Sequence, residues 1–236
     1  MILELKNVTK LYSNGRGVED ISFTLTAGEI LGLLGPNGSG KTTTMKAIMG
    51  LVKPSSGEIT ICDEDAINDH ELAMAHTGAL IEAPALYEYL TPEQNLKLAA
   101  KFYKEVDDAY IEEVLKMVQM DRYKKDKTSS LSLGMKQRVG IALALISKPK
   151  LLILDEPANG LDIDGMQFVR ELVKQMAENG TAVMMSSHLA HEIQQTATKV
   201  AVIKEGKLLA LESMEKIIEN HENVEEFFLS VRGLAI

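Results

Sequence analysis

The segment from Gly35 to Thr42, which matches G-x-x-x-x-G-K-[S/T], constrains this chain most. Its glycines let the backbone adopt positive φ, so that successive N–H groups can point at a bound anion. Lys41 adds a positive charge for phosphates, and the Thr42 hydroxyl is a suitable magnesium ligand. The pattern predicts a nucleoside triphosphate site with magnesium. The residues expected to hold the nucleotide are Gly35, Pro36, Asn37, Gly38, Ser39, Gly40, Lys41, Thr42 and Thr43.

The residues before this loop predict strands. Residues 29–34 form a continuous apolar run that is typical of a strand covered on both faces. Residues 2–12 and 18–26 alternate apolar and polar side chains around a polar turn at 13–15, which predicts an antiparallel hairpin. Residues 57–62 predict another strand. We expect an α/β fold with a P-loop NTPase core and an N-terminal antiparallel β subdomain.

A second apolar run, Leu151–Leu154, ends in the carboxylates of Asp155 and Glu156. Open α/β sheets bind ligands at the carboxyl ends of their strands. Asp155 can hold the magnesium ion, and Glu156 can orient or deprotonate an attacking water molecule. The alternative is a strand that ends in a solvated acidic turn.

The rest of the chain predicts a helical lobe and a helical tail. Residues 84–148 show helical patterns, with a capping box at 91–94 and one apolar face over 110–118. The core resumes at 151 with a strand, a helix closed by Gly180 and a strand at 181–186, and then a hairpin over 200–211. We expect one domain over 1–236, with its core at 1–83 and 149–211, a lobe at 84–148 and a tail at 212–236. The acidic tail is expected to pack on the core as an amphipathic helix or to offer a regulatory surface.

Composition limits the partners and the compartment. The chain has 236 residues, 45% of them hydrophobic, and a net charge of -9, which argues against non-specific nucleic-acid binding. The single cysteine, Cys62, rules out an internal disulfide. Because no run approaches the 18 or so apolar residues of a membrane span and the N-terminus lacks a signal peptide, we expect a cytosolic protein.

Four further motifs make the chain resemble the nucleotide-binding subunit of an ABC transporter over nearly its whole length. Residues 131–135, Leu-Ser-Leu-Gly-Met, resemble the signature motif, and residues 158–162, Ala-Asn-Gly-Leu-Asp, resemble the D-loop. Residues 186–188, Ser-Ser-His, resemble the switch histidine, and Tyr12 lies where the family stacks an aromatic ring on adenine.

The resemblance implies a head-to-tail pair of cassettes, expected here as a homodimer, around two ATP molecules. Ser132 and Gly134 would meet the γ-phosphate held by the other subunit, while Asp162 would bridge the two sites. His188 would contact the γ-phosphate, and opening after hydrolysis would move a membrane permease at the inner face of the cell membrane. Simpler roles stay open: Tyr12 as a packing residue, His188 as a turn residue and Ser132 as a helix cap.

One residue departs from the family pattern. The Q-loop glutamine is replaced in Gly78-Ala-Leu-Ile-Glu82, where the carboxylate could coordinate magnesium or the water molecule. Glu82 could also be an exposed loop acid. Together with the altered signature motif, it resembles the branch that serves bacitracin export and lantibiotic self-protection.

The leading hypothesis is therefore an ATP-driven exporter of a membrane-active peptide, whose permease docks at residues 82–87 and the helical lobe. Three other hypotheses remain: an ABC scaffold for cofactor assembly or nucleic-acid processing, a small-molecule P-loop kinase, and an ABC exporter of another drug or lipid. The first often shows tandem cassettes or basic faces, and the second needs an arginine-rich lid. Neither feature is evident in the sequence.

Overall fold

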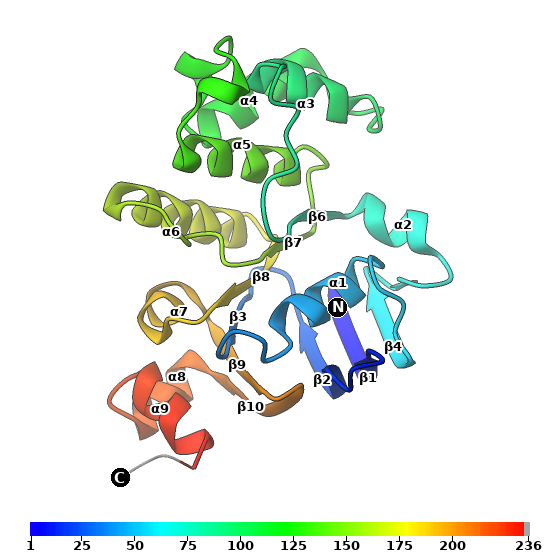
Figure 1. Cartoon of the computed structure of the whole chain (residues 1–236), viewed down its shortest axis with the longest axis vertical. Coiled ribbons are helices and arrows are strands. Elements are labelled where there is room, and N and C mark those ends of the chain that lie inside the picture. The colour runs from blue at the N-terminus through cyan, green and yellow to red at the C-terminus, as the bar shows by residue number, and fades with distance from the viewer. Residues whose placement is uncertain (234–236) are drawn as a thin grey trace.

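The computed structural model describes residues 1–233 and contains two β-sheets with helices around them (Figure 1). One sheet is antiparallel in the order β2-β1-β4-β5, and the other has the order β10-β9-β3-β8-β7-β6. The strands are β1 Leu3–Leu11, β2 Gly17–Leu25, β3 Ile30–Leu34, β4 Ser56–Ile61, β5 Glu64–Asp65, β6 Thr77–Leu80, β7 Leu151–Leu154, β8 Ala182–Ser187, β9 Lys199–Lys204 and β10 Lys207–Ser213. The helices are α1 Lys41–Ile48, α2 His70–Ala75, α3 Pro92–Ala100, α4 Asp108–Met117, α5 Leu133–Leu145, α6 Ile163–Glu178, α7 Ala190–Thr196, α8 Met214–Asn220 and α9 Val224–Val231. The predicted α/β fold with an antiparallel β subdomain and a helical lobe is confirmed.

The central strand β3 explains why its sequence is apolar throughout. All of its residues are buried, and alternate side chains serve different cores. Leu31 and Leu33 pack with α1 and the antiparallel sheet. Ile30 and Leu34 pack on the opposite face, in the core that includes residues of α5, α6 and α7. Strand β3 pairs in parallel with β8 and β9, so the loop that follows it leaves from the middle of the sheet.

Helices α3, α4 and α5 form the lobe at the top of Figure 1. The predicted capping box is confirmed, because the Thr91 side chain accepts from the backbone N–H of Gln94 and the Gln94 side chain accepts from that of Thr91. Helix α3 begins at Pro92, the first helical position that the capping box predicts, and residues 84–91 at the start of the lobe are not helical. The buried Asn95 side chain holds this segment instead, accepting from Tyr87 N at 2.9 Å and donating to Tyr87 O at 3.2 Å.

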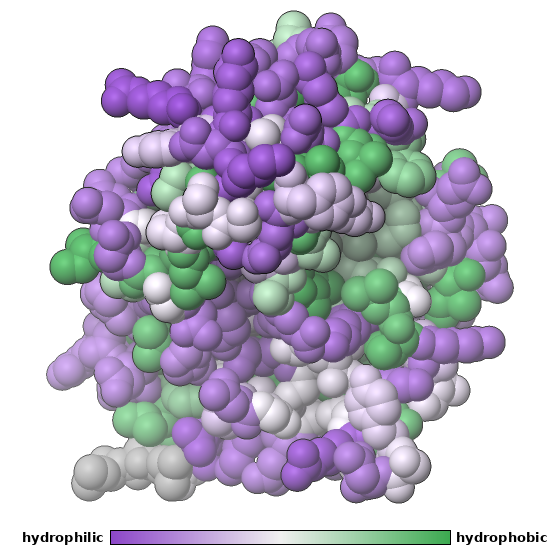
Figure 2. All heavy atoms as spheres, turned by 45° about the horizontal axis from the view of Figure 1, so that its top comes forward, coloured by the Kyte–Doolittle hydropathy of each residue, from purple (hydrophilic) through white to green (hydrophobic). Residues whose placement is uncertain are grey.

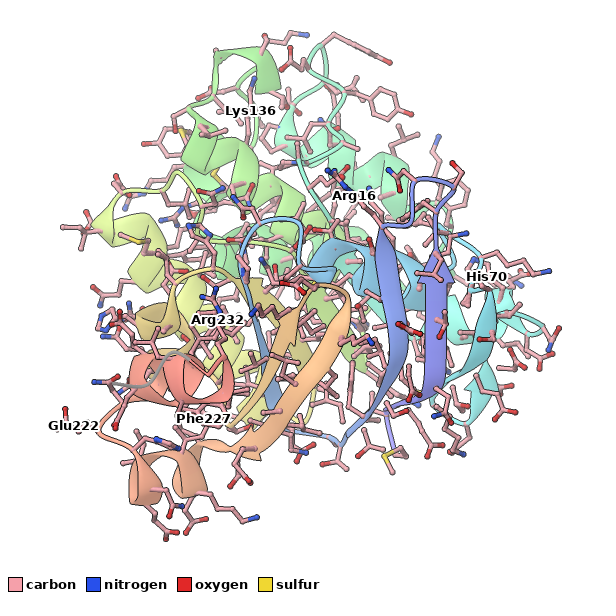
Figure 3. The ribbon with its side chains drawn as sticks, turned by 60° about the horizontal axis from the view of Figure 1, so that its bottom comes forward. Arg16, His70, Lys136, Glu222, Phe227 and Arg232 are labelled. Atoms are coloured by element: carbon pink, nitrogen blue, oxygen red, sulfur yellow. The ribbon has the colours of Figure 1, made fainter. Side chains whose placement is uncertain are left out.

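The C-terminal tail forms two short helices, α8 and α9, and not the one helix expected. The first ends at Asn220, and Asn223 caps the second, with its side chain accepting from Glu226 N at 2.9 Å. Val224 and Phe227 are buried in the core that includes α7. Figure 3 shows Phe227 on α9 and Glu222 in the turn before it. The tail therefore docks on the core, as predicted, while the last part of the predicted tail, 234–236, lies outside the described residues.

The hairpin β9–β10 turns at Glu205 and Gly206, as predicted, and both residues have positive φ. Gly206 N donates to Ser39 O at 2.8 Å, so this turn is hydrogen-bonded directly to the glycine-rich loop. The sequence did not predict α2, β6 or α7, each of which spans seven residues or fewer. Over residues 1–233, no helix is long and apolar enough to cross a membrane.

Candidate functional site

The loop between β3 and α1 forms a cradle for an anion. Gly40, at the start of α1, has a φ of 115°, and a Cβ on Gly35 would lie 2.3 Å from Ile203 O. Only glycine fits either position without strain. Lys41 is 5% exposed, and its Nζ donates to Gly35 O at 2.7 Å. The lysine ammonium is therefore held directly against the loop.

A chain of short hydrogen bonds joins α1 to two strand ends. Thr42 Oγ1 donates to Asp155 Oδ2 at 2.8 Å. The other Asp155 oxygen, Oδ1, accepts from Ser186 Oγ at 2.6 Å. Ser186 Oγ in turn accepts from Glu156 N at 2.9 Å. Ser186, at the end of β8, thus fixes both acidic residues that follow β7.

Glu156 lies between two cationic or proton-donating side chains. Its Oε1 is 3.3 Å from Lys41 Nζ, and its Oε2 is 2.8 Å from His188 Nδ1. Because a carboxylate only accepts, Nδ1 of His188 carries the proton in this contact. Glu156 has a φ of 48°, a left-handed conformation that is uncommon outside glycine. The structure therefore brings together three of the predicted catalytic residues.

A groove of about 370 Å³ runs beside the loop. Tyr12 lines this groove together with the loop residues and Glu156, which is the arrangement that the predicted adenine and phosphate roles require. Its predicted lining residues are Tyr12, Asn37, Gly38, Gly40, Lys41, Thr42, Thr43 and Glu156. Arg16, which the sequence did not single out, also lines the groove and lies at the tip of the β1–β2 hairpin (Figure 3).

The signature and D-loop residues lie together but serve as caps within this chain. Ser132 Oγ accepts from Met135 N at 3.2 Å at the start of α5, and Asp162 Oδ1 accepts from Gly165 N at 2.8 Å at the start of α6. A Cβ on Gly134 would meet the Leu161 side chain at 3.4 Å. The helix-cap role of Ser132 is confirmed, and its predicted phosphate role stays a prediction.

Glu82 lies next to Lys46 on α1. Its Oε1 is 2.6 Å from Lys46 Nζ, and its side chain is 64% exposed. The hydrogen bond that Lys46 donates to Glu82 is the main cause that raises the pKa of Lys46. The structure does not bring Glu82 into contact with Thr42 or Asp155, so its predicted metal role stays a prediction.

Sequence reasoning missed Ser186 and Lys46 as parts of the site. A signal for Ser186 was available, because it lies near the end of a strand and two residues before the motif histidine. For Lys46 the signal was its spacing of four residues from Thr42, which places both on one face of α1.

The residues present fit a nucleotide phosphate and its magnesium ion. Ser39 Oγ is buried, and no group among residues 1–233 hydrogen-bonds to it. Helix α1 begins without a side-chain cap on the N–H groups of its first turn, as far as the described chain shows. Uncapped N–H groups beside a buried lysine suit a phosphate, while the Thr42 hydroxyl and the Asp155 carboxylate suit Mg²⁺.

Comparison with known proteins identifies the family. Residues 18–159 match the family model described as ABC transporter. The ABC transporter ATP-binding protein YhcH of Bacillus subtilis (strain 168) is 40% identical over 231 residues, 98% of this chain and 75% of that protein. The bacitracin transport ATP-binding protein BcrA of Bacillus licheniformis is 38% identical and covers 100% of this chain and 77% of its own length. The lantibiotic transport ATP-binding protein SrtF of Streptococcus pyogenes is 36% identical over 96% of each chain.

Solved structures agree with this assignment. An ATP-binding subunit of an ABC transporter superposes with a TM-score of 0.89 at 28% identity, over 98% of this chain and 100% of that one. A dimer of the ATP-binding cassette MJ0796, bound to ADP and Pi after hydrolysis, superposes with a TM-score of 0.81 at 28% identity, over 90% of this chain and 99% of that one. This chain therefore belongs to the ABC transporter family, as an ATP-binding, ATP-hydrolysing subunit.

Proposed function

We propose that this subunit drives the export of a membrane-active peptide antibiotic of the bacitracin or lantibiotic type through a separate permease. Two observations support this substrate class. Relatives at 36% and 38% identity are a lantibiotic and a bacitracin transport protein. The chain also carries Glu82 where the family pattern has glutamine, a departure in which it resembles this branch.

The position of Glu156 is the observation that best supports its role in ATP hydrolysis. Its carboxylate lies within 3.3 Å of Lys41 and 2.8 Å of His188, beside the Thr42–Asp155 pair. In this position Glu156 can accept a proton from a water molecule that attacks the γ-phosphate. Lys41 and His188 hold the carboxylate in place, and Lys41 adds charge for the phosphates. Mg²⁺ held by Thr42 and Asp155 would supply charge neutralisation at the phosphates.

The signature residues support a head-to-tail homodimer. Gly134 faces Leu161 of the D-loop, and Leu133 beside it faces Gly160 of the same loop. The apolar side chains beside them are open to solvent, since Leu133 is 62% and Ile163 is 77% exposed. A second copy would cover these side chains and bring its Ser132 and Gly134 to the nucleotide. The dimeric state of the cassette MJ0796 supports the same arrangement.

A groove at the lobe suits a permease segment. It has a volume of about 270 Å³ and lies between the residue 85–87 loop and helices α3 and α5. Tyr87 and Phe102, at its edge, are 50% and 84% exposed. Figure 2 shows apolar side chains gathered in a hollow below the lobe. We propose that an apolar cytoplasmic helix or loop of the permease docks here.

Two variants test the hydrolytic roles. Glu156→Gln should lower the ATP turnover rate by roughly 10²- to 10⁴-fold and keep nucleotide binding, because only the proton acceptor is lost. Lys41→Ala should weaken nucleotide binding itself. Normal turnover in the Glu156→Gln protein would remove Glu156 as the base.

The transport role needs a cellular test. Bacteria that express the chain with its permease should tolerate more bacitracin or lantibiotic than bacteria that express the Glu156→Gln variant with the same permease. Deletion of the permease should abolish the difference. Equal tolerance in all three strains would exclude both peptide classes as substrates.

A further inference from the structure

Two polar pairs lie side by side between α1 and the sheet. Thr42 and Lys46 are four residues apart on α1 and therefore share one face of the helix. Thr42 contacts Asp155 at 2.8 Å, and Lys46 contacts Glu82 at 2.6 Å. The two acids leave neighbouring parallel strands, since Leu80 of β6 pairs with Leu154 of β7. Glu82 thus lies next to the candidate magnesium site but contacts a different residue.

Electrostatics link the two pairs. The Glu82 hydrogen bond is the main cause that raises the pKa of Lys46, and the charge of Asp155 contributes in the same direction. Lys46 therefore lies within the field of the candidate magnesium ligand. A glutamate in place of a neutral glutamine adds a negative charge at this edge of the sheet, and the Lys46 ammonium offsets it.

The backbone also restricts where the Glu82 side chain can go. Glu82 has a φ of 63°, a conformation that is costly for a residue with a Cβ. The ion pair with Lys46 is a contact that can offset this cost. Loss of Lys46 would leave a free carboxylate beside Asp155.

We propose that Lys46 is a positioning residue that holds Glu82 outside the coordination sphere of the magnesium ion and offsets its charge. This inference rests on the proposed magnesium–nucleotide function of the site. It differs from a direct metal role for Glu82, because the Glu82 carboxylate stays paired with Lys46 while the nucleotide is bound and does not coordinate magnesium.

A mutant cycle with a fluorescent ATP analogue tests the proposal. The magnesium concentration for half-maximal binding is measured for the parent, Lys46→Met, Glu82→Gln and the double variant. Lys46→Met should lower that concentration about threefold, because the freed carboxylate reaches the metal. Glu82→Gln alone and the double variant should stay near the parent value, and Lys46→Arg should behave as the parent.

Three results of this mutant cycle would overturn the proposal. If Glu82→Gln alone raises the half-maximal magnesium concentration severalfold, Glu82 is itself a metal ligand. If Lys46→Met has no effect, or the double variant keeps the Lys46→Met value, Lys46 does not act through Glu82. Failure of the parent protein to bind the analogue at all would instead refute the proposed function.

The chain offers a closely matched control pair. Lys136 Nζ and Glu88 Oε1 are also 2.6 Å apart, and their side chains are 26% and 62% exposed against 28% and 64% for Lys46 and Glu82. Lys136 lies in the helical lobe (Figure 3). Lys136→Met should leave the magnesium dependence unchanged. An equal shift in that variant would show a general effect of surface charge and would overturn the proposal.

Discussion

Ser186→Ala tests the hydrogen-bond chain that fixes the two acids of the site. The Ser186 side chain is fully buried, donates to Asp155 and accepts from Glu156 N. Its loss leaves two buried groups each short of a partner, at about 1–3 kcal/mol apiece. Because Asp155 keeps its hydrogen bond from Thr42, we expect the free energy of unfolding to fall by about 3 kcal/mol in total. In a chain of this length that lowers the unfolding temperature by roughly 9 °C, which thermal unfolding with a fluorescent dye would measure.

The ATP turnover rate distinguishes a positioning role of Ser186 from a purely stabilising one. Ser186→Ala should lower the ATP hydrolysis rate at 20 °C by about tenfold or more, because both acids lose their fixed geometry. Ser187→Ala is the matched control, since the Ser187 side chain is also buried and makes two bonds, to Glu192 and from Leu189 N. It should destabilise the protein but keep turnover within about threefold of the parent. Equal turnover losses in the two variants, or none in Ser186→Ala, would refute the reasoning.

Three further predictions concern stability. Thr91→Ala removes the capping box of α3 and should cost about 1 kcal/mol in urea unfolding, while an unchanged midpoint would contradict the cap's role. Burial acts to raise the pKa of Glu29, but hydrogen bonds from a backbone N–H and a lysine outweigh it and hold the pKa below 4.5. The stability that Glu29 contributes is therefore present above pH 4.5 and is lost as the pH falls through the lower pKa of the folded state. The difference in unfolding free energy between the parent and Glu29→Gln should narrow from pH 7 to pH 4. A difference that stays constant over this range would refute the reasoning. Gly206→Ala should lower the unfolding temperature more than Gly180→Ala, because both have positive φ but only the first would place a Cβ 2.5 Å from a backbone oxygen. Equal shifts would contradict the close approach.

Local patterns in the sequence predicted much of the fold. The alternating runs of β1 and β2, the apolar run of β3 and the glycine-rich loop each depend on residues close together in the chain, and the structure confirms the strands. The non-helical path of residues 84–91 has a tertiary cause. Asn95 reaches back to Tyr87 and satisfies its backbone, which propensity alone does not reveal.

The residues of the candidate site could likewise be predicted where a local motif marks them, but not where they depend on tertiary contacts. Lys41, Thr42, Asp155 and Glu156 could be named from motifs, because each motif is contiguous. The link through Ser186 depends on β7 and β8 being neighbours in the sheet, which no local pattern records. The partner of Glu82 likewise depends on how α1 lies on β6 and β7.

One helix organises the acidic groups of this sheet edge. Glu82, Asp155 and Glu156 follow the adjacent parallel strands β6 and β7. Each contacts a different side chain of α1, and the three contacts are Glu82 with Lys46, Asp155 with Thr42 and Glu156 with Lys41. These partners all lie within six consecutive residues of a helix whose buried face is packed between the two sheets. Because α1 begins directly at the phosphate loop, any shift of that loop moves all three partners together. The charge balance of the site and the position of the loop are therefore coupled through a single rigid element.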